Sequence, residues 1–366
     1  MSILLMAFGV AWLLTLLALR LAKRYSRLSY DHDLSGPQKI HAVPVPRIGG
    51  AGIFLGCLAG LLVAIAQQKG SVGGGSLGLW LLVAALPAFL AGMTEDLTKD
   101  VSPRRRLAAT AASAMLAAYL LGAVINRSGL PGVDSLLGWS AVALMVTVVV
   151  VAGIANAVNI IDGFNGLASM CSVIMLAGMA YVAYQVGDVL LYSMALAGIG
   201  AVLGFFLWNY PAGYIFLGDG GAYFLGFYVA ELGILLLVRN PTVSPMFPLL
   251  ICIYPVFETL FSIYRRVVVR GRPSSMPDGI HLHSLVFKRL MRWAVGTIDP
   301  HARTQRNSLT SPYLWFICML SVVPAVMFWD QTWILLGLVI VFACGYVCLY
   351  ARIVRFRTPR WLIFRR

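Results

Sequence analysis

Charged residues are scarce in this chain. Only 11% of its 366 residues are charged and just 14 residues are acidic, whereas about 25% charged residues is usual in a soluble globular protein. The hydrophobic share is 60% and the mean hydropathy is +0.84. This composition excludes an ordinary soluble domain and is typical of an all-α polytopic membrane protein.

Cysteine is also rare, with 6 in the chain. All lie in apolar runs without metal-ligand spacing, which indicates packing. The sequence shows neither an internal repeat nor a separate soluble module, so we treat residues 1–366 as one integral membrane domain. Its largest non-membrane segment is residues 265–311, within which residues 284–293 predict a short amphipathic helix at the membrane interface.

Eleven segments are long and apolar enough to cross a bilayer, for which a helix needs about 20 residues. They cover residues 3–21, 48–66, 77–93, 107–125, 136–155, 167–186, 188–207, 221–238, 245–264, 312–329 and 332–350. The first has no basic residues before it, so we interpret it as a span and not as a cleaved signal peptide.

The basic residues orient these spans. With eleven spans, all of the 28 lysines and arginines except Lys69, Arg127 and Arg239 fall on one side of the membrane. The positive-inside rule then predicts an N-terminus outside and a C-terminus in the cytoplasm. The net charge of +14 therefore indicates contact with anionic membrane lipids. It does not indicate nucleic-acid binding, which would need basic residues interleaved with aromatics in a soluble module.

An unusually polar stretch, Asn156–Leu167, joins two of the apolar runs. It places three asparagines and Asp162 at fixed offsets between the fifth and sixth predicted spans. The plain alternative is a turn in which Asp162 caps the following helix. So many amide and carboxylate groups in one short connection favour a functional site over a simple turn.

Three further polar clusters fall on the same predicted face. They are Glu95-Asp96 followed by Arg106, the segment Asn209–Gly221 with Asp219, and the segment with His281 and His283. Each has its own plain alternative: a solvated acidic pair, a glycine-flanked turn, or two histidines that would not share a helix face. We interpret their shared side as evidence for one composite site.

Phosphoryl transfer suits this collection of groups. Carboxylates from separate loops can hold Mg²⁺, which prefers oxygen ligands and keeps waters for substrate phosphates. Arginine and histidine can neutralise a pyrophosphate, and a further carboxylate can accept a proton from the attacking group. A site at the membrane interface implies one water-soluble substrate and one carried by lipid.

At these residues the chain resembles a known family, the polyprenyl-phosphate N-acetylhexosamine-1-phosphate transferases, which are glycosyltransferase family 4-like membrane enzymes. The resemblance extends from Lys39 to His283 and is most specific in Asn156–Leu167 and Phe216–Gly221. It implies an enzyme of the bacterial cytoplasmic (inner) membrane that transfers a sugar 1-phosphate from a UDP-N-acetylhexosamine, or a 6-deoxy relative, to undecaprenyl phosphate, releasing UMP. The transfer is either direct or in two steps through an aspartyl-phosphate, and the sequence does not separate the two routes. It also implies Mg²⁺, or Mn²⁺ in its place, as cofactor. A homodimer is common in the family.

The resemblance assigns roles to individual residues. Asp219 would be the principal metal ligand, with Asp162 beside the metal and the pyrophosphate, and Glu95 or Asp96 would be the general base. The remaining residues would bind substrate: Lys39, His41, Arg106, Asn156, Asn159, Asn165, Asn209, Phe216, His281 and His283. Among these, Phe216 would stack on uracil.

Three positions depart from the usual family pattern. Glu95 stands where an aspartate is usual, which shifts the predicted base towards Asp96. Asn165 replaces a second aspartate, and Ser284 replaces a final histidine. The Asp162–Gly166 variant resembles the branch that begins O-antigen or other surface polysaccharides. The alternatives are a phospho-MurNAc-pentapeptide transferase of peptidoglycan synthesis and, from another class, a multispanning transporter or flippase.

Two glutamates lie inside predicted spans. Glu258 is expected near the cytoplasmic interface, either as a functional group or as an ion-pair partner of Arg265 or Arg266. Glu231 is expected deeper, paired within the bundle. A transporter would hold its ionisable groups near the midplane, whereas most of them here fall at loop ends.

Overall fold

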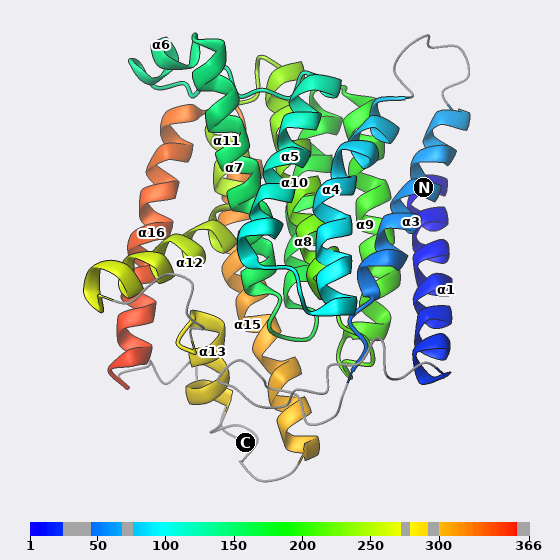
Figure 1. Cartoon of the computed structure of the whole chain (residues 1–366). Helices are drawn as coiled ribbons and strands as arrows, with labels where there is room; N and C mark the ends of the chain where they lie inside the picture. The colour runs from blue at the N-terminus through cyan, green and yellow to red at the C-terminus, as the bar shows by residue number, and fades with distance from the viewer. Residues whose placement is uncertain (25–44, 68–75, 272–278, 292–299, 357–366) are drawn as a thin grey trace.

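The computed structural model describes residues 1–24, 45–67, 76–271, 279–291 and 300–356. In these ranges the chain is built from helices (Figure 1), as predicted. Nine described helices are long and apolar enough to cross a membrane. They are α1 (Ser2–Arg24), α3 (Gly49–Gln67), α4 (Leu77–Thr98), α7 (Ser140–Ile161), α8 (Leu167–Gln185), α9 (Val189–Asn209), α10 (Gly218–Arg239), α15 (Pro300–Met327) and α16 (Thr332–Val354).

The two other predicted spans have a different form. Residues 107–125 fall largely within α5 (Pro103–Leu121), whose first turn carries three arginines. Residues 245–264 were expected to form one continuous helix, which is wrong, because they divide into α11 (Met246–Ile251) and α12 (Ile253–Tyr264). Pro255 has no N–H for the carbonyl of Ile251, which weakens the helix at this point. Eleven spans therefore stay a prediction.

Helix α10 forms the centre of the bundle, and nearly all of its side chains are buried. It packs against α3, α4, α7 and α8. Glycines allow these backbones to approach closely. A Cβ added at Gly226 would lie 2.6 Å from the Cα of Ala155. Glu231 lies on this helix, and its carboxylate is fully buried without a hydrogen-bond partner in the described part of the chain. The pairing expected for it is therefore not found.

The polar connections gather at one end of the bundle. Figure 1 shows α1 running downward from the N-terminus, and the links α4–α5, α7–α8 and α9–α10 all at the lower end, where α16 also ends. The large loop contributes α13 (Leu282–Leu285) and the π-helical segment η2 (Val286–Leu290) to the same end. Four predicted polar clusters are thus brought to one face, as the alternation of spans requires.

The predicted interfacial helix is wrong in one respect. Its described part is helical, but Leu285, Val286 and Leu290 are buried within the protein. They lie in segments that pack against α15 and α16, so the apolar side of this helix covers the bundle and not a lipid surface.

Candidate active site

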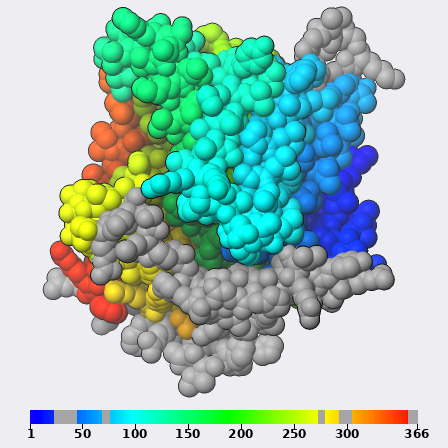
Figure 2. Space-filling model, viewed as in Figure 1, coloured from blue at the N-terminus to red at the C-terminus, as the bar shows by residue number. Residues whose placement is uncertain are grey.

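A cavity of about 380 Å³ lies at the lower end of the bundle. In Figure 2 the surface is hollowed between the ends of α4 and α5 in cyan and of α12 and α13 in yellow. Ten of the predicted site residues line the cavity: Glu95, Arg106, Asn159, Asp162, Asn165, Asn209, Phe216, Asp219, His281 and His283. Segments distant in the sequence therefore form one polar space.

Asp219 lies in the first turn of α10, at the helix N-terminus. Arg106 donates a hydrogen bond to its Oδ2, and the amide of Asn159 donates to its Oδ1 at 3.1 Å. Gly218 has a φ of +75°, and a Cβ there would lie 2.5 Å from Oδ2 of Asp96. A glycine is therefore needed immediately before Asp219. The partial positive charge of the helix N-terminus favours anions here.

Asp96 lies behind the cavity and does not line it. It is 2% exposed, and its two oxygens accept hydrogen bonds from the backbone N–H groups of Asp219 at 3.0 Å and Gly220 at 2.9 Å. These are donors that a helix N-terminus leaves unpaired. Asp96 therefore anchors the start of α10, and its position argues against the predicted preference for Asp96 as base.

Glu95, the neighbouring residue, does line the cavity. Its Oε2 accepts a hydrogen bond from the backbone N–H of Val101 at 2.8 Å. Since successive residues on a helix point about 100° apart, the pair Glu95-Asp96 divides between the cavity and the helix interior. Glu95 is the member of the pair that can reach a substrate.

Asp162 ends α7 and does not cap the following helix. The N-cap of α8 is Gly166, with a φ of +72° and no side-chain cap, so the capping alternative is wrong. Burial around Asp162 raises the pKa of its carboxyl to about 7, and the charge of Arg47 opposes this rise. A carboxyl with this pKa is partly protonated near neutral pH.

The asparagines hold loops as well as lining the cavity. The Oδ1 of Asn209 accepts from the N–H of Gly166 at 2.6 Å, and its Nδ2 donates to the carbonyl of Ile215 at 2.7 Å. The Nδ2 of Asn165 donates to the carbonyl of Pro211 at 3.1 Å. These bonds join the α7–α8 and α9–α10 loops. Both side chains are about 5% exposed, so a large part of their hydrogen-bonding capacity is structural.

Asn156 does not line the cavity. It lies further into α7, where its Oδ1 accepts a hydrogen bond from the hydroxyl of Tyr223 at 3.3 Å. Its predicted substrate contact is thus not supported by its position. Lys39 and His41 lie outside the described residues.

Phe216 pairs with the end of the basic segment that begins at Lys39, in which Arg47 was not predicted as a site residue. Its N–H donates to the carbonyl of Pro46 at 2.9 Å, and its carbonyl accepts from the N–H of Gly49 at 3.1 Å. This pairing brings Arg47 to the cavity wall. The missed signal was the position of Arg47 in the same basic segment as Lys39. Ser284, noted only as a departure from the family pattern, also lines the cavity.

The two histidines stack on one another. His281 lies directly before α13 and not within it. Its ring is nearly parallel to that of His283, with centroids 5.0 Å apart and planes 10° apart. The expectation that they would not share a face assumed a helix at both residues. His283 also contacts Phe164 edge to face, with centroids 5.4 Å apart, which joins the histidine segment to the α7–α8 loop.

The donor set suits a hard divalent cation. No group of three histidine, cysteine, aspartate or glutamate side chains forms a metal cluster among the described residues. Asp162 and Asp219 line the same cavity. Mg²⁺ is usually bound by one or two carboxylates, with waters and substrate phosphates completing its shell. Two carboxylates that line one polar cavity match this coordination preference.

The chain is similar to proteins of a known family. A family model described as Glycosyl transferase family 4 matches residues 79–237. A probable undecaprenyl-phosphate N-acetylglucosaminyl 1-phosphate transferase of Bacillus subtilis is 30% identical over 280 residues, covering 76% of this chain and 75% of the relative. An undecaprenyl-phosphate alpha-N-acetylglucosaminyl 1-phosphate transferase of Thermotoga maritima is 27% identical over 265 residues, covering 71% and 74%.

A phospho-N-acetylmuramoyl-pentapeptide-transferase of Oceanobacillus iheyensis is also similar, at 28% identity over 251 residues, covering 64% of this chain and 75% of the relative. Together with the helical bundle, these matches define a membrane-embedded transferase. The chain belongs to the polyprenyl-phosphate N-acetylhexosamine-1-phosphate transferase family, as its motifs predicted.

Proposed function

We propose that this chain transfers a sugar 1-phosphate from a UDP-N-acetylhexosamine, or a 6-deoxy relative, to undecaprenyl phosphate in a Mg²⁺-dependent reaction. The observation that carries the proposal is the convergence of Glu95, Asp162, Asp219 and Arg106 on one cavity at the end of the bundle. This arrangement supplies carboxylates for a metal and a base, and guanidinium groups for phosphate, where a lipid phosphate at the membrane surface can enter.

The reaction forms one P–O bond and breaks another. A phosphate oxygen of the lipid attacks the β-phosphorus of the UDP-sugar, and the bond between the β-phosphorus and the bridging oxygen breaks, so that UMP leaves. Glu95 accepts the proton of the lipid phosphate. Arg106 and Arg47 neutralise the pyrophosphate, which the N-terminus of α10 also favours. Asp219 and Asp162 would hold Mg²⁺, which when bound offsets charge on the phosphates.

Eleven spans with an outer N-terminus would place this cavity on the cytoplasmic side of the bacterial inner membrane. The relatives from Bacillus and Thermotoga, named as N-acetylglucosaminyl 1-phosphate transferases, support an N-acetylhexosamine donor. The product would begin a surface polysaccharide such as O-antigen. The Oceanobacillus relative keeps the peptidoglycan substrate as the second candidate.

The test is UMP release by the purified chain with undecaprenyl phosphate and a panel of UDP-sugars, including UDP-MurNAc-pentapeptide, with mass spectrometry of the lipid product. We expect release with one N-acetylhexosamine donor and its loss with EDTA. Asp219→Asn should abolish release in folded protein. No release with any donor would contradict the proposal and favour the transporter alternative. Release that persists in EDTA would contradict the Mg²⁺ dependence of the transfer.

A further inference from the structure

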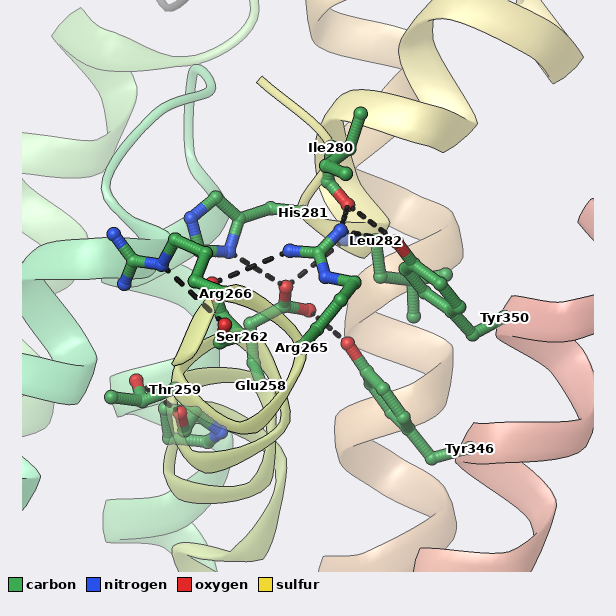
Figure 3. A network of polar contacts seen from close by, with 11 residues as sticks. Glu258, Thr259, Ser262, Arg265, Arg266, Ile280, His281, Leu282, Tyr346 and Tyr350 are labelled. Atoms are coloured by element: carbon green, nitrogen blue, oxygen red, sulfur yellow. Dashed lines mark hydrogen bonds and ion pairs between the residues drawn. The ribbon is translucent and has the colours of Figure 1, made fainter. Parts of the chain in front are cut away.

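Glu258 forms a buried polar network beside the cavity (Figure 3). It lies in α12 and is 1% exposed. Its Oε1 accepts hydrogen bonds from Nδ1 of His281 and from the N–H of Leu282, both at 3.0 Å. Its Oε2 accepts from the hydroxyl of Tyr346 in α16 at 2.6 Å. Glu258 is thus paired with His281, whereas the sequence offered Arg265 or Arg266 as its partner.

The backbone on the other side of His281 is held as well. The carbonyl of Ile280 accepts from Nη1 of Arg265 at 2.7 Å and from the hydroxyl of Tyr350 at 3.1 Å. Arg265 and Tyr350 also contact each other, and both are mostly buried. Residues of α12 and α16, together with Arg265 directly after α12, therefore hold the chain immediately before and after His281, in addition to its ring.

The contact with Glu258 orients the His281 ring. A carboxylate accepts but does not donate, so Nδ1 of His281 must be the donor, and Nε2 lies on the opposite edge of the ring. His281 lines the cavity and stacks on His283. In turn, a Cβ added at Gly163 would lie 3.7 Å from Nε2 of His283. The network thus extends from α16, through Glu258 and the two rings, to the loop of Asp162.

We propose that Glu258 is a positioning residue for the transfer reaction, which holds His281 with its Nε2 edge towards the substrate phosphates. Tyr346 fixes the other carboxylate oxygen and so makes α16 part of the active site. The inference rests on the proposed function. It concerns residues beyond the segment 79–237 that the family model matches. Outer partners that orient a metal-ligating imidazole typically contribute about 10–100-fold to activity, and we expect an effect of the same order for an imidazole that contacts phosphate.

The experiment compares kcat and KM, per folded molecule, for Glu258→Ala, Glu258→Gln and a matched control, Glu231→Ala. Glu231 is also a fully buried glutamate of a membrane helix, but it has no hydrogen-bond partner in the described ranges. We expect Glu258→Ala to lower kcat on the order of 10–100-fold. Glu258→Gln should retain most activity, because its amide oxygen accepts the same two N–H groups and the Tyr346 hydroxyl can turn to accept from its NH₂.

The control separates positioning from stability. Both alanine variants leave a cavity and should lower the melting temperature in detergent, but Glu231→Ala should keep the wild-type kcat. A decisive measurement is the double variant with His281→Ala. If Glu258 acts through His281, then Glu258→Ala should lower kcat less than about threefold further in that background.

Any of three results would overturn the inference while leaving the transferase activity established by the wild-type chain. The first is a wild-type kcat for folded Glu258→Ala, which would make the network purely structural. The second is full additivity of Glu258→Ala with His281→Ala. The third is wild-type activity in His281→Ala alone, which would remove the residue that Glu258 is proposed to position.

Discussion

Gly92→Ala tests how the fold positions Asp219. Gly92 lies one helical turn before Asp96 on the same side of α4, against the first turn of α10. A Cβ at Gly92 would lie 2.5 Å from the N of Gly220 and 2.6 Å from the carbonyl carbon of Asp219. Ordinary contacts are near 3.5 Å, so α4 and α10 would have to separate by about 1 Å.

That separation would break the contacts that hold the site. The bonds from Asp219 and Gly220 N–H to Asp96 are 3.0 and 2.9 Å, and a shift of about 1 Å exceeds the range of a hydrogen bond. Each charge-assisted bond contributes about 1.5–3 kcal/mol, so we expect a loss of about 3–6 kcal/mol locally. A catalytic group misplaced by about 1 Å can lower kcat on the order of 100-fold.

The assay is UMP release per folded molecule, with thermal unfolding measured in the same detergent. Gly153→Ala is the matched control, because Gly153 lies in α7 and a Cβ there meets no atom within 4 Å. Alanine is also favoured over glycine in a helix by about 1 kcal/mol, so the control should be as stable as wild type or more so. Wild-type stability and turnover in Gly92→Ala would refute the reasoning.

Three further predictions follow from the same geometry. Glu95→Gln should lower kcat by at least about 100-fold without changing the Mg²⁺ concentration that gives half-maximal activity. Asp96→Asn should instead lower the melting temperature and raise that Mg²⁺ concentration. Equal effects of the two substitutions on kcat and on stability would contradict the division of roles. Burial raises the pKa of Asp162 to about 7, so protons should compete with Mg²⁺ for this carboxylate below that pH. The Kd for Mg²⁺, measured by calorimetry, should therefore rise about tenfold for each unit by which the pH falls below 7. Asp162→Asn should remove this pH dependence. Asp188 lies in the link between α8 and α9, at the opposite ends of these helices from the cavity residues Asn165 and Asn209. It caps α9 through the N–H of Leu191 at 3.1 Å and also accepts a hydrogen bond from Arg239 at 2.7 Å. Asp188→Ala should therefore destabilise the protein by at least about 1–2 kcal/mol with wild-type turnover per folded molecule.

Hydropathy and charge are local properties of the chain, so the sequence alone predicted the helical bundle and the gathering of its polar loops. An apolar run of about 20 residues can satisfy its backbone in a membrane only as a helix, and successive spans bring alternate loops to the same side. The motifs Asn156–Leu167 and Phe216–Gly221 therefore indicated one composite site, and ten predicted residues line the cavity.

The division of labour among those residues was decided only by the tertiary structure. Glu95 and Asp96 are adjacent in sequence, yet one lines the cavity and the other binds the backbone of α10, because that depends on which helix packs on each side of α4. The pairing of Glu258 with His281 and Tyr346 joins residues up to 88 positions apart. No local pattern encodes such a contact, since it arises from the packing of α12 against α16.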